Sequence, residues 1–170
     1  MNRAFVALGS NLGDRRRHLE EAVRAMRRTS EVAKISSLFE SDPVGGPLQD
    51  RYLNAVVELR TAFSAFRLLQ VLGELERAAG RVRTVRFGPR TLDLDLLWWN
   101  GEALRSDVLT LPHPRAHERR FVLEPWAEIW PDGVLRGRRL SEWLACAPSG
   151  GLARIAGPEW AVDAGFAWSP

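Results

Sequence analysis

The sequence predicts a single α/β (α+β) domain in which strands and helices follow one another as β-α-β-β-α-β. Short apolar or alternating runs mark four strands, and apolar residues at helical spacing mark two helices between them. Turns that contain Gly and Pro separate several of these elements. This order is the split βαβ arrangement of ferredoxin-like sandwiches, for which we expect one antiparallel sheet and helical additions toward the C-terminus.

The first half of the pattern ends at a loop rich in Pro and Gly. Residues 4–8 (AFVAL) form a short apolar run that predicts a buried strand, and Gly9 ends it. An amphipathic helix is predicted next from apolar residues at i, i+3, i+4 and i+7. These residues are Leu19, Ala22, Val23 and Met26. Residues 32–39 predict a second strand, and residues 41–47 (SDPVGGP) predict a loop.

The second half of the pattern begins with alternating apolar residues over 53–59, which predict a third strand. A second helix is predicted over 65–79, with Ser64 as its N-cap and Gly80 just past its end. Residues 91–99 (TLDLDLLWW) predict the fourth strand, which the turn Asn100-Gly101 closes. Beyond residue 133 the pattern weakens to one helix expected over 140–146. We expect residues 134–170 to form an appendage packed on a single domain that spans 1–170.

Composition places the chain among ordinary soluble proteins. It has 170 residues, 45% hydrophobic and 26% charged, which supplies a core and excludes disordered and fibrous classes. No apolar run approaches the roughly 20 residues that span a bilayer, and the N-terminus lacks a signal-like cleavage region, so we expect a cytoplasmic protein without a membrane partner. Cys146 is the single cysteine and cannot form an intramolecular disulfide. We expect it to be a small buried hydrophobe.

The positive charge of the chain comes almost entirely from arginine. Lys34 is the only lysine, so the 24 basic residues include 23 arginines behind the net charge of +3. A drift from lysine to arginine along a whole chain usually reflects compositional bias. A local cluster is more informative because the planar arginine fork suits phosphate. Such a cluster falls within ten residues, at Arg81, Arg83, Arg86 and Arg90.

Asp93 and Asp95 lie two residues apart in the predicted fourth strand, directly after this arginine cluster. Residues i and i+2 of a strand point to one face about 6.5 to 7 Å apart, so the leucines between them face the core. Spacing alone leaves two readings open, a solvated polar face or a site for one or two hard cations. The neighbouring arginines favour the cation site, because metal ions and arginines together neutralise a polyphosphate.

Two histidines and one asparagine are further candidates for a site. His113 and His117 are four residues apart, but Pro114 precedes any helix and no Cys is near, which argues against zinc. His113 lies between two prolines and is better suited to contact with a phosphate or ribose, with a turn without function as the alternative. Asn54 interrupts an apolar alternation and is a candidate for binding a heterocycle edge. Residues 9–14 (GSNLGD) match no phosphate-loop motif, which excludes a P-loop kinase.

Five motifs in order resemble the 6-hydroxymethyl-7,8-dihydropterin pyrophosphokinase family of folate biosynthesis. They are residues 9–14 (GSNLGD), 42–47 (DPVGGP), 52–55 (YLNA), 87–95 (FGPRTLDLD) and 111–114 (LPHP). The resemblance spans about residues 4–131. It implies a ferredoxin-like enzyme that transfers diphosphate from ATP, its co-substrate, to the pterin hydroxymethyl group and releases AMP. It also implies two Mg²⁺ ions, small-molecule substrates, and a monomer.

The resemblance implies a role for each matching position. Asp93 and Asp95 are the implied Mg²⁺ ligands, and Asp95 is also a candidate to receive the hydroxyl proton. The implied ATP-binding residues are Glu76, Arg81, Arg83, Arg90, His113 and Arg119, of which Arg81 and Arg90 also count as catalytic. The implied pterin-binding residues are Pro43, Val44, Gly45, Tyr52, Asn54 and Phe121. Among these, Asn54 is expected to bond the ring, and Tyr52 and Phe121 to stack on its faces. Phe87 stands where some members carry Trp.

Two other functions, RNA binding and nucleotidyl transfer, are alternatives for this sequence. A ferredoxin-like RNA-binding module would use aromatic residues on its strand faces, whereas Asp93 and Asp95 on such a face would repel a phosphate backbone. We therefore expect no nucleic-acid partner. A two-metal nucleotidyltransferase would use the same carboxylates but attack the α-phosphorus. Neither rival explains Asn54 beside the loop at residues 41–47.

Overall fold

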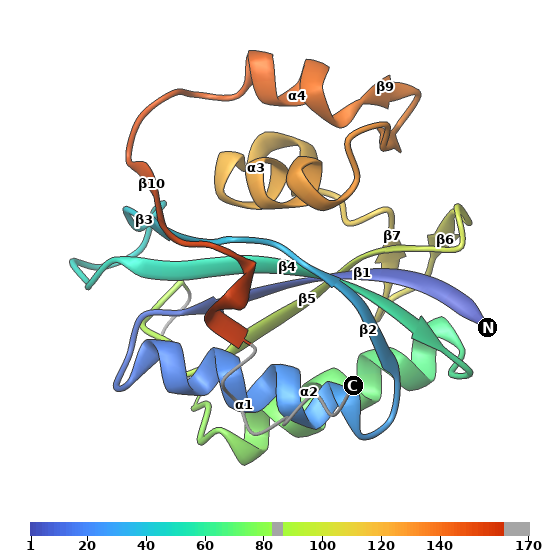
Figure 1. The fold of residues 1–170 in the computed structure, drawn as a ribbon, viewed down its shortest axis with the longest axis horizontal. Helices are drawn as coiled ribbons and strands as arrows, with labels where there is room; N and C mark the ends of the chain where they lie inside the picture. The colour runs from blue at the N-terminus through green and yellow to red at the C-terminus, as the bar shows by residue number, and fades with distance from the viewer. Residues whose placement is uncertain (83–86, 162–170) are drawn as a thin grey trace.

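One six-stranded antiparallel sheet lies between two layers of helices in the computed structural model, which describes residues 1–82 and 87–161 (Figure 1). The strands of the sheet are β1 (Asn2–Ser10), β2 (Glu31–Ile35), β3 (Leu38–Ser41), β4 (Tyr52–Thr61), β5 (Asp93–Trp99) and β10 (Leu152–Ala156). The α-helices are α1 (Arg15–Arg27), α2 (Ala65–Ala78), α3 (Arg120–Ile129) and α4 (Leu140–Cys146). Two short hairpins, β6–β7 (Leu104–Arg105 with Thr110–Leu111) and β8–β9 (Val134–Leu135 with Arg138–Arg139), and two 3-10 helices, η1 (Ala116–Glu118) and η2 (Pro158–Ala161), complete the described elements.

The topology confirms the predicted ferredoxin-like order. Neighbouring strands follow the path β10-β3-β4-β1-β5, and β2 pairs with the far end of β4. All these pairings are antiparallel. The turn after β5 also has the predicted form, because Asn100 and Gly101 both have positive φ, as two-residue hairpin turns require.

The single strand predicted over residues 32–39 is wrong, because Ser36 and Ser37 divide it into β2 and β3. Ser36 N donates to Val56 O at 2.9 Å, and Ser36 Oγ accepts from Val56 N at 2.9 Å, so a side chain replaces a carbonyl in the ladder. Ser37 Oγ donates to Glu128 Oε1 on α3 at 2.7 Å. The chain therefore bends where two buried serines use their side chains for tertiary contacts.

Helices α1 and α2 cover one face of the sheet, on the side opposite α3 and α4 (Figure 1). The predicted caps are in place for α2, where Ser64 accepts from Arg67 N and Gly80 follows with φ +75°. The core on this face contains the apolar face of α1 and the alternating residues of β4 and β5, including Leu94 and Leu96. Asp93 and Asp95 consequently point to the opposite face, as the period of two predicts.

Helix α3 covers half of that opposite face and was not predicted from the sequence. Pro125 lies inside it, and a proline in a helical pattern normally indicates an end. Its buried residues, with Trp126 the largest, form a second core with Phe5, Val56 and Leu97 of the sheet. The other half of this face, toward the ends of β1, β4 and β5, carries the cavities described below.

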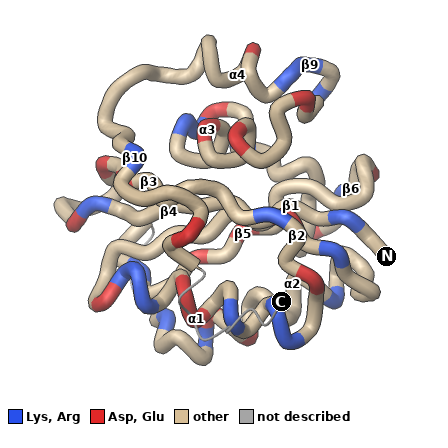
Figure 2. Tube along the Cα trace, viewed as in Figure 1, with Lys and Arg blue, Asp and Glu red and all other residues tan. Residues whose placement is uncertain are grey.

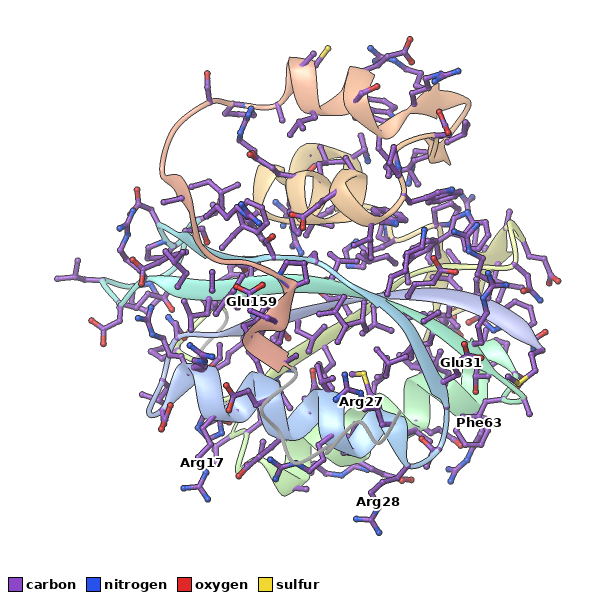
Figure 3. The ribbon with its side chains drawn as sticks, in the orientation of Figure 1. Arg17, Arg27, Arg28, Glu31, Phe63 and Glu159 are labelled. Carbon is purple, nitrogen blue, oxygen red and sulfur yellow. The ribbon has the colours of Figure 1, made fainter. Side chains whose placement is uncertain are left out.

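The C-terminal segment is part of the sheet. The predicted helix over residues 140–146 is confirmed as α4, but Cys146 at its end is exposed, so its predicted burial is wrong. Strand β10 pairs with β3, and η2 follows it back to α1 (Figure 1). There Trp160 is buried in the first core and its Nε1 donates to Ser36 O at 2.9 Å. Arg27, labelled in Figure 3, donates to Ala161 O at 3.2 Å.

Basic and acidic residues are interleaved along α1 (Figure 2). Arg16 and Arg17 pair with Glu20 and Glu21 at 2.7 and 2.8 Å, and Arg17 and Arg28 extend away from the sheet (Figure 3). Exposed pairs of this kind contribute little to stability. Among the described residues, no helix combines the length and apolar composition needed to cross a bilayer.

Candidate active site

Two cavities of about 660 Å³ each lie side by side and share one wall. The first lies over the open half of the sheet face and is bordered by the loop after β3 and by the segment before β10. The second lies between α2, residues 81–82 and 87–90, and the segment around His113. The residues that line both cavities are Phe87, Arg90, Asp93, Asp95 and Arg119. The predicted metal ligands therefore lie between two separate binding spaces.

Each cavity is lined by the residues predicted for one of the two substrates, with Arg90 and Arg119 reaching both. The first cavity is lined by all six predicted pterin-binding residues, namely Pro43, Val44, Gly45, Tyr52, Asn54 and Phe121. The second is lined by five predicted ATP-binding residues, namely Glu76, Arg81, Arg90, His113 and Arg119. Arg83 and its neighbour Arg86 lie outside the described residues.

The sheet register explains why these residues meet. Strand β1 is central, and Gly9 pairs with Asn54 on β4 and with Asp93 on β5. Ala7 pairs with Asp95 in the same way. A Cβ at Gly9 would lie 3.8 Å from Asn54 Oδ1 and 3.9 Å from Asp93 Cβ, so a larger side chain would project between the two groups. Small residues on the central strand thus form the floor of the first cavity.

Asp93 is held by two arginines. Its carboxylate accepts from Arg90 Nη1 at 2.6 Å and lies 2.8 Å from Arg81 Nη1. Arg81 also pairs with Glu76, whose Oε1 accepts from the backbone N of Leu94 at 2.8 Å. Arg81 and Arg90, which lie on either side of the undescribed residues 83–86, are therefore tied to β5. An anion that binds these arginines, or a cation that binds the Asp93 carboxylate, would compete with these ion pairs.

Asp95 has a different environment from its neighbour. Among residues 1–82 and 87–161 it receives no hydrogen bond, and its closest basic atoms are Arg119 Nη1 at 3.6 Å and His113 Nε2 at 3.9 Å. Removal from water raises the pKa of Asp95 to about 6, and the charge of Asp93 adds to the effect while Arg119 opposes it. Near neutral pH this carboxylate can therefore either bind a cation in its ionised form or accept a proton.

His113 presents a neutral ring to the second cavity. Burial, followed by the charge of Arg119, lowers the pKa of His113 to about 4. Its Nδ1 accepts from the backbone N of Arg115 at 3.2 Å, so the proton of the neutral ring resides on Nε2. The backbone N of His113 donates to Leu97 O at 2.8 Å, which fixes the segment against β5. His113 can therefore donate one hydrogen bond to a phosphate oxygen at all pH values above its pKa.

Asn54 and Tyr52 form the polar part of the first cavity. Asn54 is 4% exposed, and its Nδ2 donates to Ser41 Oγ at 2.8 Å. Tyr52 Oη lies 3.3 Å from Gln49 Oε1, and burial raises the pKa of this phenol. Gln49 Nε2 in turn donates to Phe87 O at 2.9 Å, which connects the loop after β3 to residues 87–90. These polar groups lie together on the wall of the first cavity.

Several residues at the cavities were not predicted from the sequence. Gln49, Arg115, Glu118 and Arg120 line the first cavity, as do residues 148–152 from the C-terminal segment. None of them lies in a motif with a regular spacing. Residues 148–152 reach the cavity through pairing of β10 with β3, and the others lie in the loop after β3 and around η1 and the start of α3.

The described residues contain no group of three or more His, Cys, Asp or Glu that could hold a metal ion without other ligands. A cation at this site would therefore take two carboxylates from the protein and oxygens from elsewhere. Mg²⁺ is commonly bound in this way, by one or two carboxylates together with substrate phosphates and water.

Residues 5–131 match the family described as 7,8-dihydro-6-hydroxymethylpterin-pyrophosphokinase. A Bacillus subtilis protein named 2-amino-4-hydroxy-6-hydroxymethyldihydropteridine pyrophosphokinase is 47% identical over 130 residues, which cover 75% of this chain and 78% of that protein. A Pseudomonas aeruginosa protein of the same name is 41% identical over 160 residues, covering 92% and 99%. A crystal structure of Plasmodium falciparum HPPK-DHPS with pteroate superposes with a TM-score of 0.69 at 11% identity. It covers 85% of this chain and 44% of that one, and supports the fold alone.

Proposed function

Since this chain belongs to the 7,8-dihydro-6-hydroxymethylpterin-pyrophosphokinase family, we propose that it transfers diphosphate from ATP to the hydroxymethyl group of 6-hydroxymethyl-7,8-dihydropterin. AMP is the second product, and the reaction belongs to folate biosynthesis. One observation carries the proposal: two cavities share a wall that contains Asp93 and Asp95. A transfer between two bound substrates needs such an arrangement, with the reacting atoms held together between two binding spaces.

The pterin occupies the first cavity in this proposal. Its volume of about 660 Å³ lies in the range of small-molecule sites, and its lining combines apolar side chains with polar and charged ones. Asn54 bonds the polar edge of the ring, while Tyr52 and Phe121 contact its faces. Residues 43–45 border the ring along the loop after β3. ATP occupies the second cavity, which Glu76, Arg81 and His113 line.

The carboxylate pair suits the two Mg²⁺ ions that the proposed reaction uses. Asp95 supports this fit because it is a partly enclosed carboxylate beside a second carboxylate, with no hydrogen-bond donor from the described chain. Asp93 and Asp95 would hold the ions, with the remaining ligands from ATP and water. Bound Mg²⁺ neutralises charge on the phosphates during transfer.

The side chains of this site then divide the work. Arg81 and Arg90 exchange Asp93 for phosphate oxygens and stabilise the charge that develops on the leaving AMP, and Arg119 adds a third cation. His113 donates from Nε2 to a phosphate oxygen. Asp95 receives the proton of the attacking hydroxyl. The pterin oxygen forms a bond to the β-phosphorus, and the bond between the β-phosphorus and the α,β-bridging oxygen breaks.

We infer further that residues 1–170 act as one catalytic domain, in a cytoplasmic monomer. Residues of one chain line both cavities, so the site needs no second copy. Light scattering coupled to gel filtration tests the oligomeric state, with the mass of one chain as the expected result.

The reaction is tested by incubating the protein with ATP, Mg²⁺ and the reduced hydroxymethylpterin. We expect AMP and pterin diphosphate in equal amounts. ADP with a pterin monophosphate would contradict the proposal, and so would pyrophosphate with an adenylated pterin. A control with single-stranded RNA should show weak binding that falls steeply with salt, since the carboxylate face opposes a phosphate backbone.

A further inference from the structure

The C-terminal segment borders the first cavity. Residues 148–152, from Pro148 to Leu152, line it together with the loop after β3. They lie beyond residues 5–131, where the family match ends. The catalytic groups described above come from other elements, so the presence of this segment at the cavity calls for a separate explanation.

The register directs Leu152 onto the same face as the pterin-binding residues. Leu152 pairs with Ser41 on β3, and Ser41 pairs with Tyr52 on β4. Directly paired residues of a sheet have their side chains on one face. These three side chains thus form a row across three strands, and Leu152 supplies its apolar end. Ser41 also accepts the hydrogen bond of Asn54, so Leu152 lies beside the polar group expected to bind the ring.

The segment is fixed to the loop that borders the cavity on the same side. The backbone N of Asp42 donates to Gly151 O at 2.9 Å, directly before residues 43–45. Farther along β10, Arg154 Nε donates to Ser37 Oγ at 2.8 Å. Trp160 then buries its ring in the core under α1. Strand β10 is therefore held at both ends, and Leu152 has a defined position at the cavity.

We propose that residues 148–152 form a wall of the pterin subsite and that Leu152 determines affinity for the pterin. This proposal rests on the proposed function. The side chain of Leu152 shields one side of the bound ring from water, so its apolar surface stabilises the complex. Leu152 does not line the second cavity, so it should not affect ATP.

The test compares Leu152→Ala with a matched variant on the same strand. Ile155→Ala removes an apolar side chain of similar size that is 51% exposed and lines neither cavity. Leu152→Met keeps the apolar volume. For each protein we would measure the pterin Kd by calorimetry, the KM values for pterin and ATP, kcat and the melting temperature.

We expect Leu152→Ala to weaken pterin binding about tenfold, with kcat and the KM for ATP within about twofold of wild type. Ile155→Ala should match wild type, and Leu152→Met should restore most of the affinity. An unchanged pterin Kd in Leu152→Ala would overturn the proposal. Equal losses of pterin and ATP affinity with a lowered melting temperature would also overturn it, because Leu152 would then be purely structural. Failure of the proposed function would instead appear in wild type, which would neither bind the reduced pterin nor release AMP.

Discussion

The substitution Asp95→Asn should stabilise the protein while it strongly slows the reaction. The side chain of Asp95 is 35% exposed, and burial beside Asp93 raises its pKa from 3.8 to about 6. A raised pKa means that the folded protein binds this proton more tightly than the unfolded chain. Ionised Asp95 therefore opposes folding, with the full effect above pH 6 and none below about pH 3.8. A neutral amide removes this cost at high pH.

The expected stabilisation is about 1 kcal/mol at pH 8. The full pKa difference would correspond to about 3 kcal/mol, but partial exposure to solvent screens most of it. A change of about 1 kcal/mol raises the melting temperature of a protein of this size by about 2 to 4 °C. The assay is thermal unfolding with EDTA at pH 8 and at pH 4.5, and the difference between variant and wild type should shrink at the lower pH.

Asp93→Asn is the matched control, because it removes the same charge from the same strand with the opposite expected sign. Asp93 is bonded to Arg90 and paired with Arg81, so its loss should cost about 1 to 3 kcal/mol. In the complete reaction, Asp95→Asn should slow the single-turnover rate by about 10²- to 10⁴-fold and change pterin affinity little. A lower melting temperature for Asp95→Asn at pH 8, or a wild-type rate, would refute the assignment of Asp95.

Three further predictions concern binding, titration and the core. Asn54→Ala should weaken pterin binding by about 1 to 3 kcal/mol and leave ATP affinity unchanged in calorimetry, since its amide bonds the ring edge; equal losses for both ligands would indicate a structural amide. In an NMR titration His113 should change protonation near pH 4, because burial lowers its pKa. The contribution of the neutral His113 ring to the stability of the fold is therefore complete above about pH 6.5 and falls as the pH drops toward 4. A titration midpoint near pH 6.5 would contradict the burial of the ring. Trp160→Ala should lower the free energy of unfolding by about 3 to 5 kcal/mol, measured by urea unfolding. Trp160→Phe should lower it by about 1 kcal/mol through loss of the hydrogen bond to Ser36 O. A wild-type unfolding curve for Trp160→Ala would show that η2 is not anchored.

Local periodicity was sufficient to predict the elements that carry the central site. The alternation around Asp93 and Asp95 depends only on the strand period, so both side chains lie on the predicted face. The caps of α2 are likewise local, since Ser64 bonds a backbone N three residues later. The resemblance then connected residues that are distant in the chain, and thirteen of its fourteen site positions line the two cavities, with Arg83 outside the described residues.

Features that depend on distant partners could not be predicted. The break at Ser36 and Ser37 depends on Val56 and Glu128, which are 20 and 91 residues away. The difference between Asp93 and Asp95 comes from which arginines reach them, which spacing does not reveal. Helix α3 could not be predicted because Pro125 normally indicates the end of a helix. This helix nevertheless forms, since its apolar face packs on the sheet.

The point of attack on ATP is the central claim, and an oxygen label tests it most directly. The reduced pterin would carry ¹⁸O in its hydroxymethyl group and be converted with ATP and Mg²⁺, and the products would be examined by phosphorus NMR and mass spectrometry. Attack by this oxygen on the β-phosphorus predicts that all the label lies in the bridge between the pterin carbon and the first phosphorus of the diphosphate, with unlabelled AMP. Label in AMP, loss of label from the pterin product, or ADP as the nucleotide product would contradict a diphosphate transfer at the wall formed by Asp93 and Asp95.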